Sequence, residues 1–428
     1  MSDFELSRID QFRQFKKQIR GNQKYLIVGI DIGKAKHHAF FGTATGHTLL
    51  KALIVENSLN GFAYLMGRVH FYIDRDGFEQ VVFGIEPTSV YHKPLAEFLI
   101  GDGHLVVYVT NEAINKNRSL LDGRWDKNDT KDCANVADLI AQGKCQYYDL
   151  PDVDVRDLRS LLLLRKRLRK QLHSSKMRIR NNLVAQYFPE FDKLWKTHEE
   201  ENLAIVRWCL APDKISAMDF EDFCALVTTG NRGARQQQRL FTIWNTAAFS
   251  IGCFAGKALD LEAKVLVDSV KLIREQIVET DNAIEDLCSR FEPYPYLRSI
   301  PGFGPYVSAV VLAAIGDARR FENAKQLLRL AGLDLSAKRS GQRSDAAVPV
   351  ISKKGKADLR YALYQAALVA SSLTPDFNNY YHRLLEGRQR EKGIRTKMLV
   401  KLAAKFLVIA WTLMKKKEPF NADYIMRD

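Results

Sequence analysis

YLIVGIDIG, residues 25–33, is an apolar run that carries Asp31 near its end and closes on glycine. Short apolar runs bounded by turn residues are typical of buried β-strands, so we expect a strand here and the start of a domain. The β-rich stretches at 38–43 and 48–56 follow after short turns. This spacing predicts that they form an antiparallel meander with the first strand.

The hydrophobic period changes after the meander. Residues 59–73 and 90–100 have the spacing of helices. Between and after them, 80–86 (QVVFGIE) and 104–110 (HLVVYVT) have the pattern of strands. Strands that alternate with helices imply parallel crossovers. An antiparallel meander followed by parallel βαβ units is the order of ribonuclease-H-like domains, so we expect an α/β domain over residues 22–150.

Two long helices are predicted in the middle of the chain. Residues 156–180 carry ten Lys/Arg and one Asp among leucines at partly helical spacing, which indicates a basic amphipathic helix. A later heptad series indicates a second helix, and the two could pair antiparallel as a coiled coil. Its members are Leu266, Val270, Ile273, Ile277, Thr280, Ile284 and Leu287. We expect these helices over 151–292, with a separate helical insert at about 195–256.

The last region, 293–428, is expected to be mainly helical. Its segment 297–314 (LRSIPGFGPYVSAVVLAA) places Pro-Gly-x-Gly before an apolar helix, which is the helix-hairpin-helix pattern. Gly302 and Gly304 would let the backbone approach a phosphate at the helix N-terminus, and so bind DNA without reading its sequence. The apolar run at 406–414 is about half the length that spans a bilayer and indicates a buried helix.

Composition favours a nucleic-acid partner over a membrane. The formal net charge of +14 is large and calls for a polyanion. We expect Arg165, Lys166 and Arg169 of the basic helix to contact phosphates. No secretion signal opens the chain, and the cysteines form neither a CxxC pair nor a zinc pattern with histidine. These features indicate a cytoplasmic protein with free, mostly buried thiols.

Four acids stand at the ends of predicted strands and helices. Asp31 ends the first strand and Glu86 ends a later parallel strand. Asp129 and Asp132 open the next helix, where their spacing puts them on one face. Phosphodiester chemistry with Mg²⁺ needs several carboxylate oxygens at one point, which strand ends beside a helix N-terminus supply. Each acid alone could be a strand end, a surface acid or a helix N-cap, and it is their conjunction that indicates a metal site.

GIDIGK at 29–34 also matches the first phosphate loop of an actin-like ATPase or a sugar kinase. That fold needs a second Asp-x-Gly phosphate loop and a glycine-rich adenosine loop. Neither follows at a suitable distance, so we set this alternative aside.

Six segments, in order along the chain, resemble a known family. In the N-terminal half they are GIDIGK (29–34), GIEPTSVYH (84–92) and KNDTKD (127–132). In the C-terminal half they are IPGFGPYVSAVVLAAIGD (300–317), AGLDLSAKRSG (331–341) and ISKKGKADLR (351–360). These segments resemble the DEDD transposases of bacterial insertion sequences, which act as RNA-guided serine recombinases. The resemblance covers most of the chain.

The resemblance implies an N-terminal RuvC-like domain and a C-terminal transposase domain. It makes the four acids ligands of Mg²⁺ or Mn²⁺, and it makes Ser340 the nucleophile. Lys338, Arg339 and Arg343 crowd the same loop, where their cations could hold the scissile phosphate and stabilise its transition state.

The chain departs from the family pattern at a few positions. Pro-Thr-Ser at 87–89 replaces the frequent Ala-Thr-Gly, Asp132 is followed by a cysteine, and Leu335 stands where proline is usual. None of these changes removes a catalytic group. They indicate a divergent member of the family.

The resemblance also implies the partners. They are double-stranded DNA at the element ends and at the target, a guide RNA encoded beside the gene, and further copies of the chain in a dimer or tetramer. The metal site of one subunit would then meet the serine of another, in the cytoplasm at the nucleoid. Two alternatives stay open: a RuvC-like nuclease of Holliday-junction type, in which the metal activates water, and a non-catalytic scaffold that binds RNA or DNA.

Overall fold

The structure is a computed structural model of the chain. It describes residues 7–87, 89–121, 129–195, 199–228, 233–336, 350–422 and 425, with the backbone alone at 119–121, 129, 130 and 336. The chain divides into two compact units, Met1–Leu150 and Pro151–Asp428.

The first unit contains a six-stranded mixed sheet in the order β3-β2-β1-β4-β5-β6. The strands are β1 (Tyr25–Asp31), β2 (Lys36–Thr43), β3 (Thr48–Glu56), β4 (Gln80–Ile85), β5 (Leu105–Tyr108) and β6 (Gln146–Tyr147). Strands β1 to β3 pair antiparallel, whereas β4 joins β1 and β5 joins β4 in parallel. The predicted meander and parallel crossovers are therefore confirmed.

Helices cover both faces of the sheet. They are α1 (Arg8–Gln18), α2 (Leu59–Asp76), α3 (Lys93–Gly101), α4 (Asn111–Leu121) and α5 (Asp129–Ala141). Alternate residues of β1 divide between the faces, because side chains of a strand point to opposite sides in turn. Leu26 and Val28 share a core with α2 and α3, while Tyr25 and Ile27 share one with α1 and α5.

The domain begins earlier than we expected. Helix α1 precedes the first strand and buries Phe15 and Ile19 in the same core as Tyr25. Its sequence, RIDQFRQFKKQ, has only Ile9, Phe12 and Phe15 as apolar residues, so its pattern did not predict a helix. Helix α4 was not predicted either, although the helix that follows it was.

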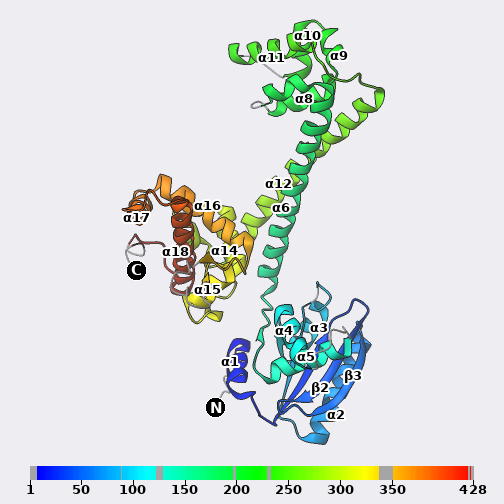
Figure 1. Cartoon of the computed structure of the whole chain (residues 1–428), viewed down its shortest axis with the longest axis vertical. Coiled ribbons are helices and arrows are strands. Elements are labelled where there is room, and N and C mark those ends of the chain that lie inside the picture. Colours follow the sequence, from blue (N-terminus) through cyan, green and yellow to red (C-terminus); the bar gives the residue numbers. More distant parts are fainter. Residues whose placement is uncertain are drawn as a thin grey trace. The chain divides into compact units, whose positions relative to one another are not determined.

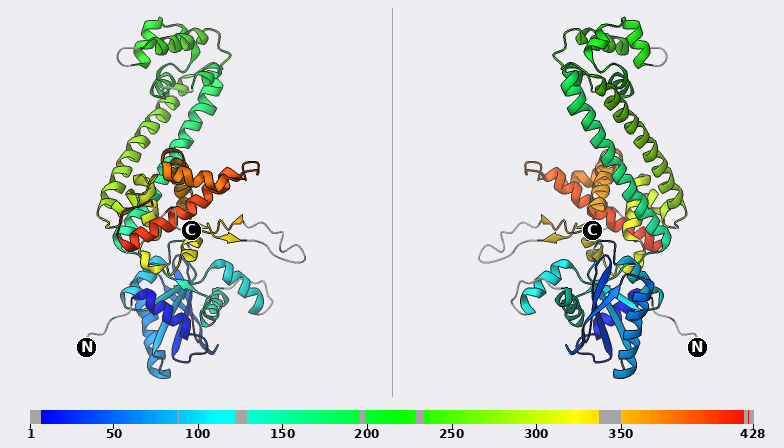
Figure 2. Two further views of the ribbon diagram at one scale, coloured as in Figure 1. Left: turned by 90° about the vertical axis from the view of Figure 1, so that its left-hand side faces the viewer. Right: turned by 90° about the vertical axis from the view of Figure 1, so that its right-hand side faces the viewer.

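The second unit is built on two long helices, α6 (Val153–Arg178) and α12 (Lys257–Ser289), which run side by side (Figures 1 and 2). Leu158 of α6 shares a core with Ile284 of α12, and Leu172 shares another core with Val267. This order makes the pair antiparallel, as predicted. The seam lies within one chain, and α6 continues into a π-helical turn, η1 (Ile179–Val184).

The insert at one end of this pair is helical, as predicted (Figure 1). Its helices are α8 (Glu199–Cys209), α9 (Pro212–Ser216), α10 (Phe220–Val227) and α11 (Ala234–Ala247). The preceding α7 (Ala185–Tyr187) and η2 (Pro189–Leu194), which lie before the predicted start at residue 195, pack into the same core. Phe188, Phe191 and Phe223 are fully buried in its core. The insert is therefore a packed body and not a loop.

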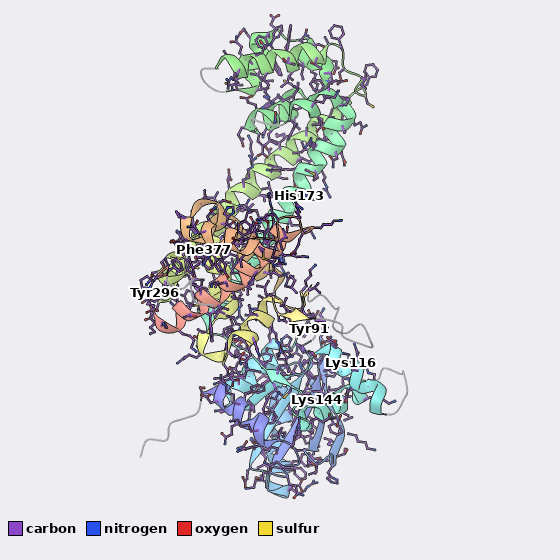
Figure 3. All side chains as sticks on the ribbon, turned by 60° about the vertical axis from the view of Figure 1, so that its left-hand side comes forward. Tyr91, Lys116, Lys144, His173, Tyr296 and Phe377 are labelled. Carbon is purple, nitrogen blue, oxygen red and sulfur yellow. The ribbon has the colours of Figure 1, made fainter. Side chains whose placement is uncertain are left out.

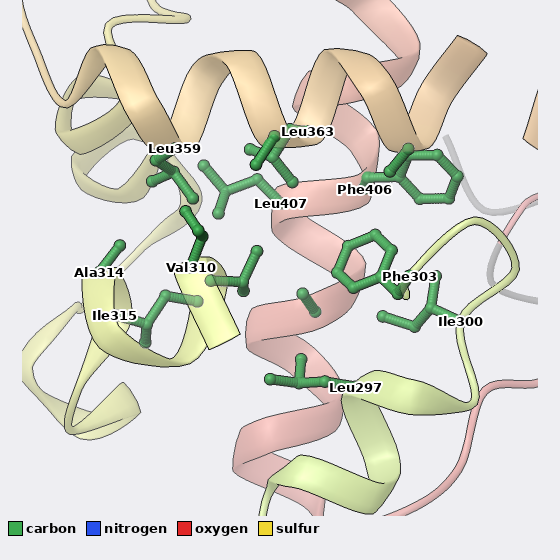
Figure 4. Close-up of a cluster of buried hydrophobic side chains, with 14 of the residues drawn as sticks. Leu297, Ile300, Phe303, Val310, Ala314, Ile315, Leu359, Leu363, Phe406 and Leu407 are labelled. Atoms are coloured by element: carbon green, nitrogen blue, oxygen red, sulfur yellow. The ribbon is translucent and has the colours of Figure 1, made fainter. Parts of the chain in front are cut away.

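The C-terminal part is mainly helical. Its elements are α13 (Tyr294–Arg298), α14 (Pro305–Ile315), η3 (Ala318–Arg320), α15 (Ala324–Ala331), β7 (Leu335–Ser336), β8 (Val350–Ile351), α16 (Ala357–Leu373), α17 (Pro375–Leu385) and α18 (Ile394–Lys416). Phe303, Leu363 of α16 and Phe406 of α18 belong to one cluster of buried apolar side chains (Figure 4). The apolar run of α18 is buried there, as predicted. Across the described ranges, no helix is both long and apolar enough to cross a membrane.

The cysteines follow the prediction of free, mostly buried thiols. All six are described and unpaired, and Cys253 is the exposed one.

The helix pair offers a stability test with a matched control. Ile277 is 5 % exposed in the seam, whereas its neighbour Val278 is 59 % exposed. Ile277→Asp puts an unpaired charge among apolar side chains and is expected to cost roughly 3–5 kcal/mol of unfolding free energy. Val278→Asp should change it by less than about 0.5 kcal/mol. Urea unfolding of both variants measures the difference, and equal stabilities would show that the seam is not packed in solution.

Candidate active site

Two acids, Asp31 and Glu86, lie at the ends of adjacent parallel strands, and we call them the strand-end acids. Asp31 is the last residue of β1, and Glu86 directly follows β4. Ile30 pairs with Ile85 in the sheet, and the Glu86 amide donates to the Ile30 carbonyl over 3.4 Å. The next residue of each strand is therefore a carboxylate, and the two acids are neighbours across the sheet. Both are half-buried.

Two glycines bring helix α5 onto this part of the sheet. A Cβ atom at Gly29 would lie 2.2 Å from the Cys133 carbonyl oxygen, and one at Gly84 would lie 1.8 Å from Cδ1 of Ile140. Only glycine permits so close an approach of helix and strands. Each glycine precedes a strand-end acid by two residues and so shares its face of the sheet. Helix α5 therefore covers the face on which both acids lie.

Asp132, in the first turns of α5, is the third acid at this place. The pKa of the adjacent Cys133 thiol is raised to about 12, first by burial and then by the negative charges of Asp31 and Asp132. The Cys133 carbonyl packs on Gly29 of β1, so β1 and the start of α5 bring Asp31 and Asp132 into the same region.

The Asp132 carboxylate is 2 % exposed and forms an ion pair with Arg118 of α4. Its Oδ1 accepts from Nε of Arg118 at 3.1 Å and from Nη2 at 2.5 Å. Sequence reasoning missed Arg118, because α4 was not predicted and nothing in the local pattern links this residue to an acid fourteen positions later.

Helix α4 is fixed to α5 by a buried amide clasp. Asn117 donates to Asn135 and to Asp138, each at 2.7 Å, and Asn135 donates back to the Ile114 carbonyl at 2.9 Å. Figure 3 places Lys116 on the same helix, where its charge faces solvent. These hydrogen bonds fix the position of the backbone from which the Arg118 side chain extends.

The donor set fits a hard divalent cation in its chemistry. Carboxylate oxygens are the ligands that Mg²⁺ prefers. Asp129, the fourth candidate ligand, begins α5, but its side chain lies outside the described residues. Among the side chains that are described, no three acids, histidines or cysteines form a group ready to hold a metal ion. Two acids are therefore neighbours at the strand ends, and the third lies on the helix that covers their face, where an arginine engages it.

The loop after β4, close to Glu86, contains a non-glycine residue with a positive φ angle. Ser89 adopts a left-handed backbone with φ of 52°. Glycine, which is frequent at this position in the family that the sequence resembles, adopts that conformation without strain. Serine there costs on the order of 1 kcal/mol, which the surrounding fold must offset.

The candidate nucleophile lies outside the described residues. Ser340 and the loop cations Lys338, Arg339 and Arg343 fall at 337–349, between β7 and β8. The structure does describe the residues on either side of this segment. Ser352 donates to the carbonyl and the carboxylate of Asp334, at 2.8 and 2.5 Å. A Cβ atom at Gly355 would lie 2.4 Å from the Gly332 amide nitrogen. The backbone after β8 therefore packs closely against the backbone before β7.

The three candidate cations of α6 differ in their surroundings. Arg165 pairs with Asp281 and lies 4.1 Å from the centre of the Tyr306 ring, so it belongs to the contacts between helices. Lys166 pairs with Asp358 at 2.8 Å on the surface. Arg169 is exposed and, within the described part of the chain, has no partner.

Further exposed cations of α6 without a described partner are Arg167, Lys170 and Arg178. Side chains project all along α6, including His173 (Figure 3). We call Arg167, Arg169 and Lys170 the cationic face.

The two glycines of the helix-hairpin-helix pattern have different roles. Gly302 has φ of 85°, and a Cβ atom there would lie 2.6 Å from the Ala366 carbonyl of α16. It is therefore needed for packing within the domain. Gly304 is the N-cap of α14, which begins with Pro305. Of the two, Gly304 lies at the helix N-terminus.

The comparisons with known proteins agree with this architecture. A family model described as a transposase, the DEDD transposase of IS110, matches residues 28–189, which include the four acids. A second model, described as the transposase of the IS116/IS110/IS902 family, matches residues 294–382, which include Ser340.

Two relatives match the chain over almost its whole length. An uncharacterized 43.6 kDa protein of insertion element IS110 from Streptomyces coelicolor is 24% identical, over 91% of this chain and 94% of its own. An uncharacterized 44.8 kDa protein of IS116 from Streptomyces clavuligerus is 22% identical, over 92% and 96%. A pilin gene-inverting protein of Moraxella bovis is 29% identical over 36% of this chain and 46% of its own. The chain therefore belongs to the IS116/IS110/IS902 family of transposases.

Proposed function

We propose that this transposase cuts and rejoins DNA with a metal-holding carboxylate site in its first unit and a serine nucleophile, Ser340, in its second. The observation that carries the proposal is the placement of Asp31 and Glu86 at the ends of adjacent parallel strands, under helix α5, which carries Asp132. The family model for this half of the chain spans the same acids.

The topology supports a ribonuclease-H-like, RuvC-like reading of the first unit. An antiparallel meander runs into parallel strands through β1 and β4, and the acids stand at the ends of these two central strands. In open sheets with parallel strands, sites form at the carboxyl ends of the strands.

The carboxylates would hold Mg²⁺ or Mn²⁺, which when bound neutralises charge on the phosphate and on the leaving oxygen. Ser340 supplies the nucleophile. Its Oγ forms a bond to phosphorus while the bond from phosphorus to the 3′-oxygen breaks, and the hydroxyl proton ends on that 3′-oxygen. The product is a 5′-phosphoserine link that retains the phosphodiester energy, so rejoining to a new strand needs no ATP.

Double-stranded DNA and a guide RNA are the proposed nucleic-acid partners. The cationic face of α6 supports binding to phosphates, because its three cations are exposed and Lys and Arg contacts of this kind position a protein on the nucleic-acid backbone. We further propose a dimer or tetramer in which one subunit brings its serine to the carboxylates of another. The name of the pilin gene-inverting relative supports rejoining of strands over simple cutting.

Covalent trapping tests this mechanism. The protein is incubated with Mg²⁺, RNA transcribed from the DNA beside its gene, and end-labelled DNA of an element end with a nick that prevents rejoining. We expect labelled DNA to remain on the protein through a denaturing gel. Cut DNA with free ends and no adduct would instead favour the nuclease in which the metal activates water, and uncut DNA would favour the non-catalytic scaffold.

Salt dependence tests the cationic face. The double variant Arg169→Gln, Lys170→Gln should weaken RNA binding and reduce the slope of log K against log salt by about 0.7–0.9 per lost phosphate contact. Lys51→Gln with Lys144→Gln removes the same charge from exposed positions of the first unit and is the control. If both double variants have the wild-type slope, the face is solvated and does not bind phosphates.

A further inference from the structure

The Asp132 carboxylate has a single partner in the described part of the chain. Its side chain is 2 % exposed, and the hydrogen bonds that it accepts come from Arg118, both to Oδ1. A buried carboxylate needs a countercharge, because its desolvation is otherwise too costly. The guanidinium of Arg118 therefore supplies the countercharge that the buried Asp132 carboxylate needs.

Arg118 is held at this place by the fold. Asn117, the residue before Arg118, donates hydrogen bonds of 2.7 Å to Asn135 and to Asp138 of α5. These bonds hold this turn of α4 against α5. The Arg118 side chain is 23 % exposed, so solvent reaches it from one side only. The ion pair is thus built into the α4–α5 hairpin and is not a chance contact between long surface side chains.

We propose that Arg118 is a positioning residue that occupies Asp132 in place of the divalent cation and competes with metal binding. The inference rests on the proposed function, since it takes Asp132 as a metal ligand. It accounts for a site in which Asp132 lies on the helix over the two strand-end acids while no three described side chains form a group ready for a metal. Metal binding then requires Asp132 to be shared with, or released by, the guanidinium.

Two opposing effects of Arg118 can be compared in size. A monocation and a dication on one carboxylate repel each other, and even with the screening of bulk water this amounts to more than about tenfold in affinity. Burial weakens the screening and increases the repulsion. Arg118 also orients the carboxylate, and losing such support typically costs about 10–100-fold in metal affinity. In a buried site the repulsion is the larger effect, so removal of the guanidinium should tighten metal binding.

The experiment titrates Mn²⁺ into the full-length protein without nucleic acid and follows binding by calorimetry. Arg118→Gln is expected to bind Mn²⁺ about tenfold more tightly than the wild type, whereas Arg118→Lys, which keeps the charge, should stay close to it. In EDTA, Arg118→Gln should melt at a lower temperature, because Asp132 loses its countercharge, and Mn²⁺ should restore the loss. Arg118→Met is a second neutral variant if the glutamine protein does not fold.

Lys116→Gln is the matched control. It removes one positive charge from the same helix, at a side chain that is 75 % exposed and pairs with Glu112. Its Mn²⁺ affinity should equal that of the wild type. In an Asp132→Asn background, Arg118→Gln should no longer tighten binding.

The outcomes separate this inference from the function on which it rests. Mn²⁺ binding that is equal or weaker in Arg118→Gln overturns the competition and leaves the carboxylate site standing. An absence of Mn²⁺ binding in the wild type and in every variant overturns the metal site itself, and this inference with it.

Discussion

Ser340→Ala is expected to abolish both the covalent adduct and DNA cleavage, by about a thousandfold or more. A serine hydroxyl is a poor nucleophile at neutral pH and needs a cation or a base beside it. Lys338, Arg339 and Arg343 stand within three positions of Ser340 in the sequence and are the candidate cations. The measurement is the trapping assay with nicked DNA, read both as adduct and as cut strand.

Ser336 and Ser344 provide internal controls for this result, because they lie in the same segment of the chain. Alanine at either position should leave the adduct at the wild-type level. Should Ser340→Ala still cut DNA to free ends, the serine is not the nucleophile. The nuclease with a metal-activated water would then replace the recombinase.

The order of strands was predictable from sequence because it depends on local pattern. The run at 25–30 is apolar throughout, as a strand buried on both faces must be, and the period later changes from 2 to 3.6. The long helices were predictable for the same reason, since Val270, Ile277 and Ile284 repeat at heptad spacing and are buried.

The elements that were missed are those whose pattern is weak. Helix α1 places Phe15 and Ile19 against the sheet, too few apolar residues to distinguish it from a solvated segment. Helix α4 buries Asn117 through hydrogen bonds to α5 and not through an apolar stripe. Such a helix depends on its tertiary partner, which no local window contains.

Parts of the candidate site were visible in the sequence, and their arrangement was not. The acids could be named because each follows a strand or opens a helix. Helix α5 reaches the strand-end acids because it packs on Gly29 and Gly84. These contacts join residues that are about a hundred positions apart for Gly29 and about fifty for Gly84. Arg118 could not be named, since an ion pair between two helices leaves no periodic signal.

Asp31→Asn and Glu86→Gln are each expected to reduce strand cleavage by about a hundred- to a thousandfold while RNA binding stays close to the wild type. Each change removes the negative charge of one proposed metal ligand and keeps the shape of the side chain. The cationic face of α6 is untouched, so affinity for phosphates should not fall. Cleavage with Mg²⁺ and with EDTA, and RNA binding measured on the same preparations, give the two readouts.

Glu79→Gln is the matched control, because Glu79 precedes β4 as Glu86 follows it and is 59 % exposed in a surface pair with Lys24. Cleavage by this variant should equal that of the wild type. Asp31→Asn keeps the size and shape of the side chain, and its melting temperature in EDTA is measured beside that of the wild type. A loss of cleavage with unchanged stability and binding therefore has one physical source, the charge of the carboxylate. Wild-type cleavage by either strand-end variant, or by the wild type in EDTA, would show that the edge of this sheet is not where DNA is cut.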